Sequence, residues 1–96
     1  MKPIELREKD IERYLVNEVR KIGGTAYKFT SPGRRSVPDR MILLKGQPAI
    51  FVECKRPGGK LTQGQKREIE KLREKDFQVY VVDSKQKVNN FVWMIS

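Results

Sequence analysis

The segment "VPDRMILLKGQPAIFVECK", residues 37–55, constrains the fold more than any other part of the chain. It contains two short apolar runs, Arg40 to Leu44 and Ala49 to Lys55, joined by "KGQP", whose glycine and proline favour a turn. Nearly continuous apolar residues are typical of central strands that are covered on both faces. Asp39 precedes the first run, and the second ends in Glu53, Cys54 and Lys55. We therefore expect a β-hairpin that gathers charged side chains at one end of two otherwise buried strands.

The flanking sequence predicts the elements that pack around this hairpin. Residues 5 to about 22 have helical periodicity, stopped by Gly23-Gly24, and a short strand follows from Thr25 to Phe29. After "RPGGK", Thr62 is placed to cap a helix of about a dozen residues. A strand from Phe77 to Val82 comes next, and Phe91 to Met94 is a candidate for a last edge strand.

The predicted order, α-β-β-β-α-β, indicates an α/β fold with a small mixed β-sheet flanked by helices. A right-handed crossover through the second helix would place the strand after it parallel to the strand that ends at Glu53. A chain of 96 residues suffices for one modest core, so we expect a single domain over residues 1–96. We expect Trp93 and Tyr80 in the core or at an interface.

Composition limits the partners and the metals. The 21 basic residues exceed the 12 acidic ones, and a net charge of +9 favours a polyanion, with nucleic acid ahead of an acidic membrane surface. No apolar run approaches the roughly 20 residues of a membrane span, and with nucleic acid favoured by the charge we expect no membrane partner. With no histidine and one cysteine, a metal here would be hard and held by carboxylate oxygens. A single cysteine also suits a reducing cytosol.

The charged end of the hairpin has the residues of a hydrolytic phosphodiester site. Alternate side chains of a strand share a face, so Glu53 and Lys55 point the same way, and Asp39 lies beside Glu53 if the strands pair. A proton or a divalent cation relieves the repulsion of two neighbouring carboxylates. Lys55 would then position a water molecule and stabilise charge on a phosphate. A solvated salt-bridge cluster would use the same three residues, but their place on adjacent apolar strands of a basic protein favours catalysis.

Two motifs carry a family resemblance. Pro38-Asp39 and Glu53-Cys54-Lys55 resemble the signature of the PD-(D/E)XK nuclease superfamily, which has a restriction-endonuclease-like core. The longer segments "RRSVPDRMIL" and "FVECKRPGGKLTQGQ" resemble its virus-type replication-repair nuclease (VRR-NUC) group, which often has glycine where this chain has Ser36. The resemblance implies a metal-dependent DNA nuclease. Asp39 and Glu53 would bind Mg²⁺ or Mn²⁺, with the Cys54 carbonyl as a possible further ligand, and Lys55 would orient the attacking water.

Three further residues have two interpretations each. Gln65 matches the family's supporting glutamine, but it also stands at capping-box spacing from Thr62. The superfamily usually adds an acid from the first helix; Glu12 is our choice and Glu8 the alternative, although a solvated glutamate explains either one. Glu18 falls amid the apolar face of that helix, either paired in the core or at an interface.

Basic residues around this site are candidates for DNA contacts. Arg34 and Arg35 follow a Pro-Gly turn just before Asp39 and would contact phosphates. Four more could extend the same surface: Lys28, Arg40, Arg56 and Lys60. The basic residues of the second helix alternate with glutamates and predict an ordinary exposed face: Lys66, Arg67, Lys71, Arg73 and Lys75.

The resemblance implies an endonuclease that acts on branched DNA, four-way (Holliday) junctions included, in DNA repair. It also implies a homodimer, with two sites for paired cuts. Such a protein would be cytoplasmic in a bacterium, or a viral protein in its host cell. Two other functions stay open, namely a non-catalytic basic DNA-binding module and a sequence-specific duplex endonuclease. A chain of 96 residues leaves little room for the base-reading domain that the latter needs.

Overall fold

A computed structural model describes residues 5–96 and has a four-stranded sheet at its centre. The strands lie in the order β1 (Thr25–Lys28), β2 (Arg40–Leu43), β3 (Ile50–Cys54) and β4 (Gln78–Val82). The β1–β2 and β2–β3 pairs are antiparallel, whereas β3 and β4 are parallel. The sheet is therefore mixed, and the predicted parallel crossover is confirmed.

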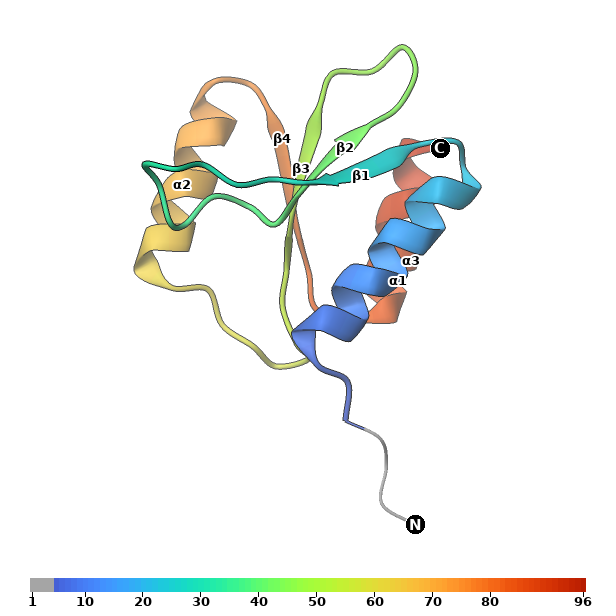
Figure 1. Cartoon of the computed structure of the whole chain (residues 1–96), viewed down its shortest axis with the longest axis horizontal. Helices are drawn as coiled ribbons and strands as arrows, with labels where there is room; N and C mark the ends of the chain where they lie inside the picture. The colour runs from blue at the N-terminus through green and yellow to red at the C-terminus, as the bar shows by residue number, and fades with distance from the viewer. Residues whose placement is uncertain (1–4) are drawn as a thin grey trace.

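Three helices cover the sheet on its two faces. Figure 1 shows α2 (Gln63–Glu74) on one side, and α1 (Glu8–Lys21) with α3 (Lys85–Ile95) on the other. The two helices on the shared face also pack against each other. The fold is thus the predicted α/β arrangement with one additional helix.

The core follows from the alternation of side chains along β3. Val52 and Cys54 point toward α1 and α3 and are fully buried in the larger apolar cluster. Phe51 points the other way, into a smaller cluster with Ile69 of α2 and Val79 of β4. Every residue of β3 is buried, as the continuous apolar run predicts for a central strand.

The predicted edge strand at Phe91 to Met94 is wrong, because these residues belong to α3. Ser84 caps that helix by accepting a hydrogen bond of 3.0 Å from the Lys87 amide. The buried residues of α3 recur at helical spacing: Val88, Phe91, Val92 and Ile95. The aromatic and β-branched content of the segment gave a misleading strand signal, since packing against α1 decides its conformation.

Several individual side chains are placed as follows. Trp93 is 81% exposed on α3, so it is not a core residue, whereas the half-buried Tyr80 packs on Phe91 with ring centroids 5.0 Å apart. Glu18 is half-buried and forms an ion pair of 2.6 Å with Lys21, one turn along α1.

None of the helices within residues 5–96 has the length and apolarity needed to cross a membrane.

Candidate active site

The register of the hairpin brings Asp39 and Glu53 together. Arg40 pairs with Val52, so Asp39 lies just before the paired residues of β2, and Glu53 follows them on β3. Because Val52 and Cys54 point toward α1 and α3, Glu53 lies on the face that α2 covers. The two carboxylates thus meet at one end of the sheet, where Glu53 contacts Gln65 in the first turn of α2.

Asp39 is held in place by the backbone of two neighbouring strands. Its Oδ2 accepts a hydrogen bond of 2.8 Å from the amide of Cys54. Its carbonyl accepts another, of 2.9 Å, from the amide of Phe29. Since the N–H and C=O of one strand residue point to the same side, the Cys54 carbonyl is also directed toward Asp39. This is the orientation that the predicted backbone ligand requires.

Glu53 is a buried carboxylate with an unsatisfied oxygen. The residue is 2% exposed, and its Oε2 has no hydrogen-bond partner within residues 5–96. Burial is the largest cause, and together with the neighbouring Asp39 carboxylate it raises the pKa of Glu53 to about 8, while Lys55 acts in the opposite direction. An isolated buried carboxylate is costly unless it is protonated or bound to a cation. The environment of Glu53 therefore favours one of these two states.

A divalent cation fits this pair of carboxylates. Within the described part of the chain, no group of three or more histidine, cysteine, aspartate or glutamate side chains could hold a metal. Mg²⁺ is commonly held by only one or two carboxylates, with water and substrate phosphate completing its octahedral shell. Asp39, Glu53 and the Cys54 carbonyl would supply such a partial set of oxygens.

Lys55 lies next to the pair and contacts α1. Its side chain is 13% exposed, and Nζ lies 3.8 Å from Oε1 of Glu8. Of the two first-helix acids considered, Glu8 therefore contacts the lysine. Glu12 instead pairs with Arg40 at 2.8 Å and with Lys28 at 3.6 Å. Two cations already neutralise the Glu12 carboxylate, which reduces its ability to bind a metal.

Gln65 performs both of its predicted interactions at once. Its backbone amide donates to Thr62 Oγ1 at 3.1 Å, and its Oε1 accepts from the Thr62 amide at 2.9 Å, which completes a capping box. Its Nε2 lies 3.4 Å from Oε1 of Glu53, a long hydrogen bond. The cap thereby fixes a side chain of α2 that contacts a candidate metal ligand.

The predicted DNA-binding residues fall into two groups. Arg35, Arg56 and Lys60 are exposed on the loops before β2 and after β3, and Lys28 is exposed at the end of β1. Arg34 is also exposed, but its Nη1 forms an ion pair of 2.7 Å with Glu68 of α2. Arg40 is half-buried and directs Nε to Glu12 and Nη1 to the Ala26 carbonyl. Nε and Nη1 of Arg40 thus donate to groups of the protein itself.

Sequence reasoning missed one part of this region. Gly64, Arg67 and Glu68 of α2 lie against the loop that carries Arg34 and Arg35. The alternation of charges along α2 predicted only a solvated face, and no local pattern signals a contact between residues 34 positions apart. The length and composition of the loop do not predict which residues of α2 it will contact.

Comparison with known proteins agrees with the fold and with the motifs. The family model described as "VRR-NUC domain" matches residues 8–86. The chain belongs to the VRR-NUC family. A solved structure described as "VRR_NUC domain" superposes with a TM-score of 0.82 at 29% identity, covering 88% of this chain and 92% of the other. A protein of Acyrthosiphon pisum secondary endosymbiont phage 1, named "Putative nuclease p44", is 58% identical over 79 residues, which cover 82% of this chain and 85% of that protein.

Proposed function

We propose that this VRR-NUC protein is a divalent-metal-dependent endonuclease that hydrolyses DNA phosphodiester bonds. The observation that carries the proposal is the buried Glu53, whose Oε2 has no partner within residues 5–96 and which lies beside Asp39. The family membership and the phage relative named a nuclease support the same class of reaction. The net charge of +9 suits DNA as the substrate.

In this proposal, Asp39 and Glu53 hold Mg²⁺ or Mn²⁺ and are both ionised when they do so. The bound cation would lower the pKa of a water ligand and neutralise charge on the scissile phosphate. The backbone amide of Cys54 fixes the orientation of Asp39, and Gln65 limits the rotation of Glu53. These contacts hold two carboxylates in a fixed geometry before substrate arrives.

Lys55 supplies the positive charge of the site. An ammonium group has three donors and no acceptor, so it orients the attacking water or binds a phosphate oxygen and does not act as a base. The attacking water would lose a proton to solvent as its oxygen forms a new P–O bond, one P–O ester bond would break, and the leaving oxygen would take a proton from solvent. Because Lys55 is 13% exposed and lies 3.8 Å from Glu8, that carboxylate limits where its Nζ can lie.

The proposal extends to branched DNA and to a homodimer. Exposed basic residues lie on loops on both sides of the site, at Arg35, Arg56 and Lys60, and could contact more than one duplex arm. A two-fold dimer would place two such sites on opposite strands. The phage origin of the relative suits action on DNA inside a bacterial host cell.

Cleavage of a labelled four-way junction, compared with a linear duplex of the same arm sequence, tests this proposal. We expect cutting with Mg²⁺ or Mn²⁺ that is faster on the junction and is lost in Lys55→Ala. Equal cutting of both substrates at one sequence would instead identify a sequence-specific duplex endonuclease. Binding of DNA without cutting by the wild type, under all metal conditions, would leave a non-catalytic DNA-binding module.

A further inference from the structure

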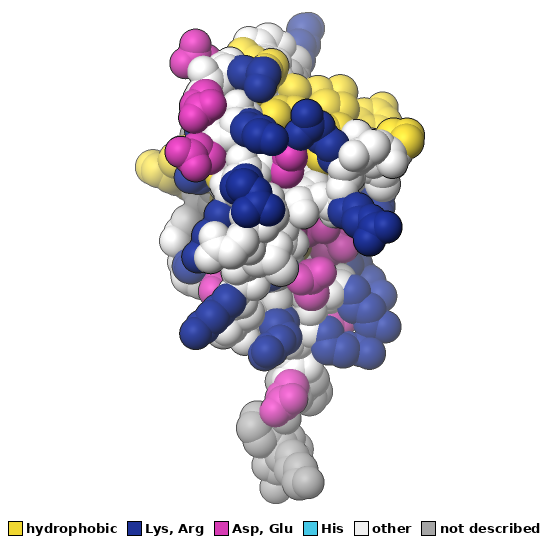
Figure 2. Space-filling view, turned by 90° about the vertical axis from the view of Figure 1, so that its left-hand side faces the viewer, with side chains coloured by type: hydrophobic (Ala, Val, Ile, Leu, Met, Phe, Trp, Pro, Cys, Tyr) yellow, Lys and Arg dark blue, Asp and Glu magenta, His cyan; other side chains and the backbone are white. Residues whose placement is uncertain are grey.

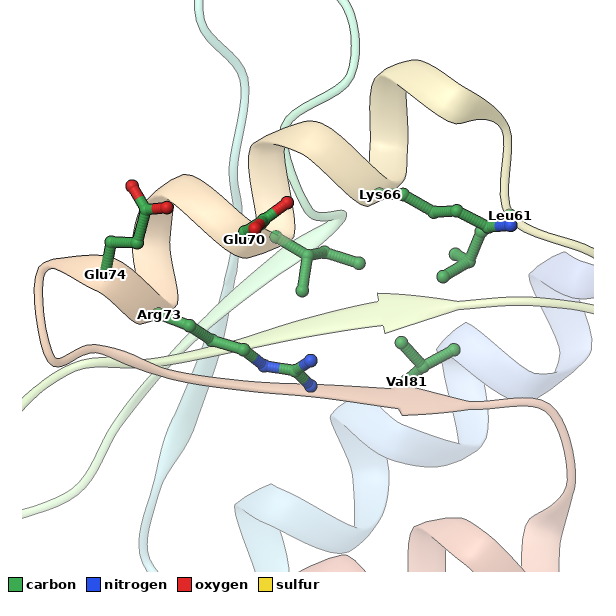
Figure 3. A pocket seen from close by; sticks show the side chains of 7 residues that line it. Leu61, Lys66, Glu70, Arg73, Glu74 and Val81 are labelled. Atoms are coloured by element: carbon green, nitrogen blue, oxygen red, sulfur yellow. The ribbon is translucent and has the colours of Figure 1, made fainter.

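The two sides of α2 carry different net charge, although basic and acidic residues alternate along its sequence. On the side facing β4, a cavity of about 530 Å³ has Lys66 and Arg73 balanced by Glu70 and Glu74 (Figure 3). Arg73 also donates a hydrogen bond of 2.7 Å to the Val79 carbonyl, which occupies its guanidinium inside the protein. This side is neutral overall and offers no preference for an anion.

The opposite side of α2 is positive. A second cavity, of about 330 Å³, lies between α2 and the loop that precedes β2. Its charged residues are Arg34, Arg35 and Arg67 with the single carboxylate of Glu68, so three guanidinium groups face one acid. Figure 2 shows many Lys and Arg side chains on the face of the molecule on which α2 lies, with several Asp and Glu side chains among them. We call the cavity lined by these three arginines the arginine pocket.

The arginine pocket is built by direct packing of loop on helix. A Cβ atom placed on Gly64 would lie 2.6 Å from Ser36 Oγ, so the side chain of this loop residue packs closely against the first turn of α2. The ion pair between Arg34 and Glu68 fastens the same loop one turn further along. Glu68 is 15% exposed and also lies 3.8 Å from Lys71. Arg34 is therefore held against α2, and Arg35 follows it along the same loop.

Both walls of the arginine pocket continue directly into the candidate active site. Gly64 precedes Gln65, which contacts Glu53, and Ser36 is three residues before Asp39. Three residues span at most about 11 Å when extended. Phosphates follow one another along a DNA strand at about 3.4 Å of helix axis, so the pocket lies within a few nucleotides of the candidate metal site.

We propose that the arginine pocket binds a backbone phosphate of the same DNA strand, a few nucleotides from the scissile one, with Arg67 as a principal ligand. This inference rests on DNA being the substrate, as proposed above. Guanidinium groups bind phosphate through paired N–H donors, and Arg67 has no ion pair within residues 5–96 that would compete. Such a contact would fix the register of the strand over Asp39 and Glu53 without reading its sequence.

Lys66 provides a matched control, because it is the next residue of α2 but lines the neutral cavity on the other side. Arg67→Ala and Lys66→Ala each remove one positive charge from one exposed helix position. Binding of a labelled duplex and of a junction would be measured in chelator, where cleavage is not required. We expect Arg67→Ala to weaken binding by about tenfold. The slope of the logarithm of the binding constant against the logarithm of salt concentration should become shallower by about one. Lys66→Ala should bind DNA nearly as tightly as the wild type. Circular dichroism would confirm that both variants are folded.

Neutral methylphosphonate linkages, placed one at a time along the strand, would locate the phosphate. In wild type, neutralising one linkage should weaken binding, and Arg67→Ala should be insensitive at that same linkage. Equal loss of binding in the two alanine variants would overturn the proposal. So would an Arg67→Ala variant that loses binding at the same neutral linkages as the wild type, or a wild type that binds no DNA. Binding with the expected pattern but no cleavage would contradict the nuclease function and leave the arginine pocket standing.

Discussion

Arg40 and Glu12 form an ion pair of 2.8 Å between α1 and the start of β2. From the sequence, Arg40 is a candidate for DNA contacts, and Glu12 is either an active-site acid or a solvated glutamate. Arg40 also donates to the Ala26 carbonyl at 3.1 Å, so its guanidinium joins α1, β1 and β2. Because Arg40 directly follows Asp39, this pair fastens the strand end that carries a candidate metal ligand.

Removing the Glu12 side chain should destabilise the protein more than removing the exposed side chain of Lys21, which pairs with Glu18. Glu12→Ala leaves Nε of the half-buried Arg40 without its carboxylate partner, and we expect a loss of about 1–3 kcal/mol in the free energy of unfolding. Lys21→Ala, which breaks the exposed end of the pair with Glu18, should cost clearly less, because solvent screens an exposed pair. Urea unfolding measures both, and equal values would contradict a structural role for the Arg40 pair.

Glu53 should make the metal-free protein less stable as the pH rises. Its folded pKa is about 8 and its ordinary value is 4.5, so between these values the folded protein holds a proton that the unfolded chain has released. Stability therefore falls across this window, by at most about 1.4 kcal/mol per pH unit. Glu53→Gln stays neutral and should lose this slope. Urea midpoints in chelator from pH 5 to 8 test it, and parallel profiles for the two proteins would contradict it.

Divalent metal should reverse this trend, because it replaces the proton on Glu53. The thermal stabilisation by Mg²⁺ should be larger at pH 8 than at pH 6, since fewer protons then compete for the carboxylate. Glu53→Gln should show little stabilisation at either pH. If Mg²⁺ stabilised both proteins equally, the cation would bind elsewhere on the chain.

Gln65→Glu separates the two interactions of this side chain. A glutamate can still accept from the Thr62 amide and complete the capping box, but it cannot donate to Glu53 and places a negative charge 3.4 Å from it. We expect the stability of α2 to be kept while metal affinity and cleavage change. Gln65→Ala should in addition lose about 1 kcal/mol of stability through the cap. Wild-type cleavage by Gln65→Glu would assign Gln65 to capping alone.

Cys54 should be chemically inert. It is 0% exposed, and burial raises the pKa of its thiol, so the reactive thiolate is absent at neutral pH. We expect a thiol reagent to label the protein only when it is unfolded. Cys54→Ala should retain cleavage, since the proposed ligand is a backbone carbonyl, at a cost of about 1–2 kcal/mol in stability. Rapid labelling of the native protein would show that this part of the sheet opens.

The sequence predicted the elements whose signal is local. The apolar run of β3 and the Thr62 cap of α2 were predicted within a residue or two of their observed bounds. The alternation along β3 also correctly placed Glu53 opposite Val52 and Cys54. In α3, residues 91–94 suit a strand by composition, and only the Ser84 cap and the spacing from Val88 to Ile95 reveal the helix.

The partners of the charged side chains could not be predicted in the same way. Arg34 meets Glu68, and Arg40 meets Glu12, across separations that no periodicity links. Sequence spacing places Glu12 on the flank of α1 from which a side chain could reach the candidate active site. It does not predict that Arg40 forms an ion pair with Glu12. Contacts of this kind depend on how loops and helices pack on the sheet. The catalytic and metal-binding roles of Asp39, Glu53 and Lys55 stay predictions.

The most direct test of the account is the single-turnover rate of DNA cleavage against Mg²⁺ concentration for wild type and Asp39→Asn. An asparagine can still accept from the Cys54 amide, so the fold should be kept. We predict a saturating rate for wild type, none in chelator, and a loss of about a hundredfold or more in Asp39→Asn. Cleavage that persists in chelator, or that Asp39→Asn leaves unchanged, would contradict a metal held by Asp39 and Glu53.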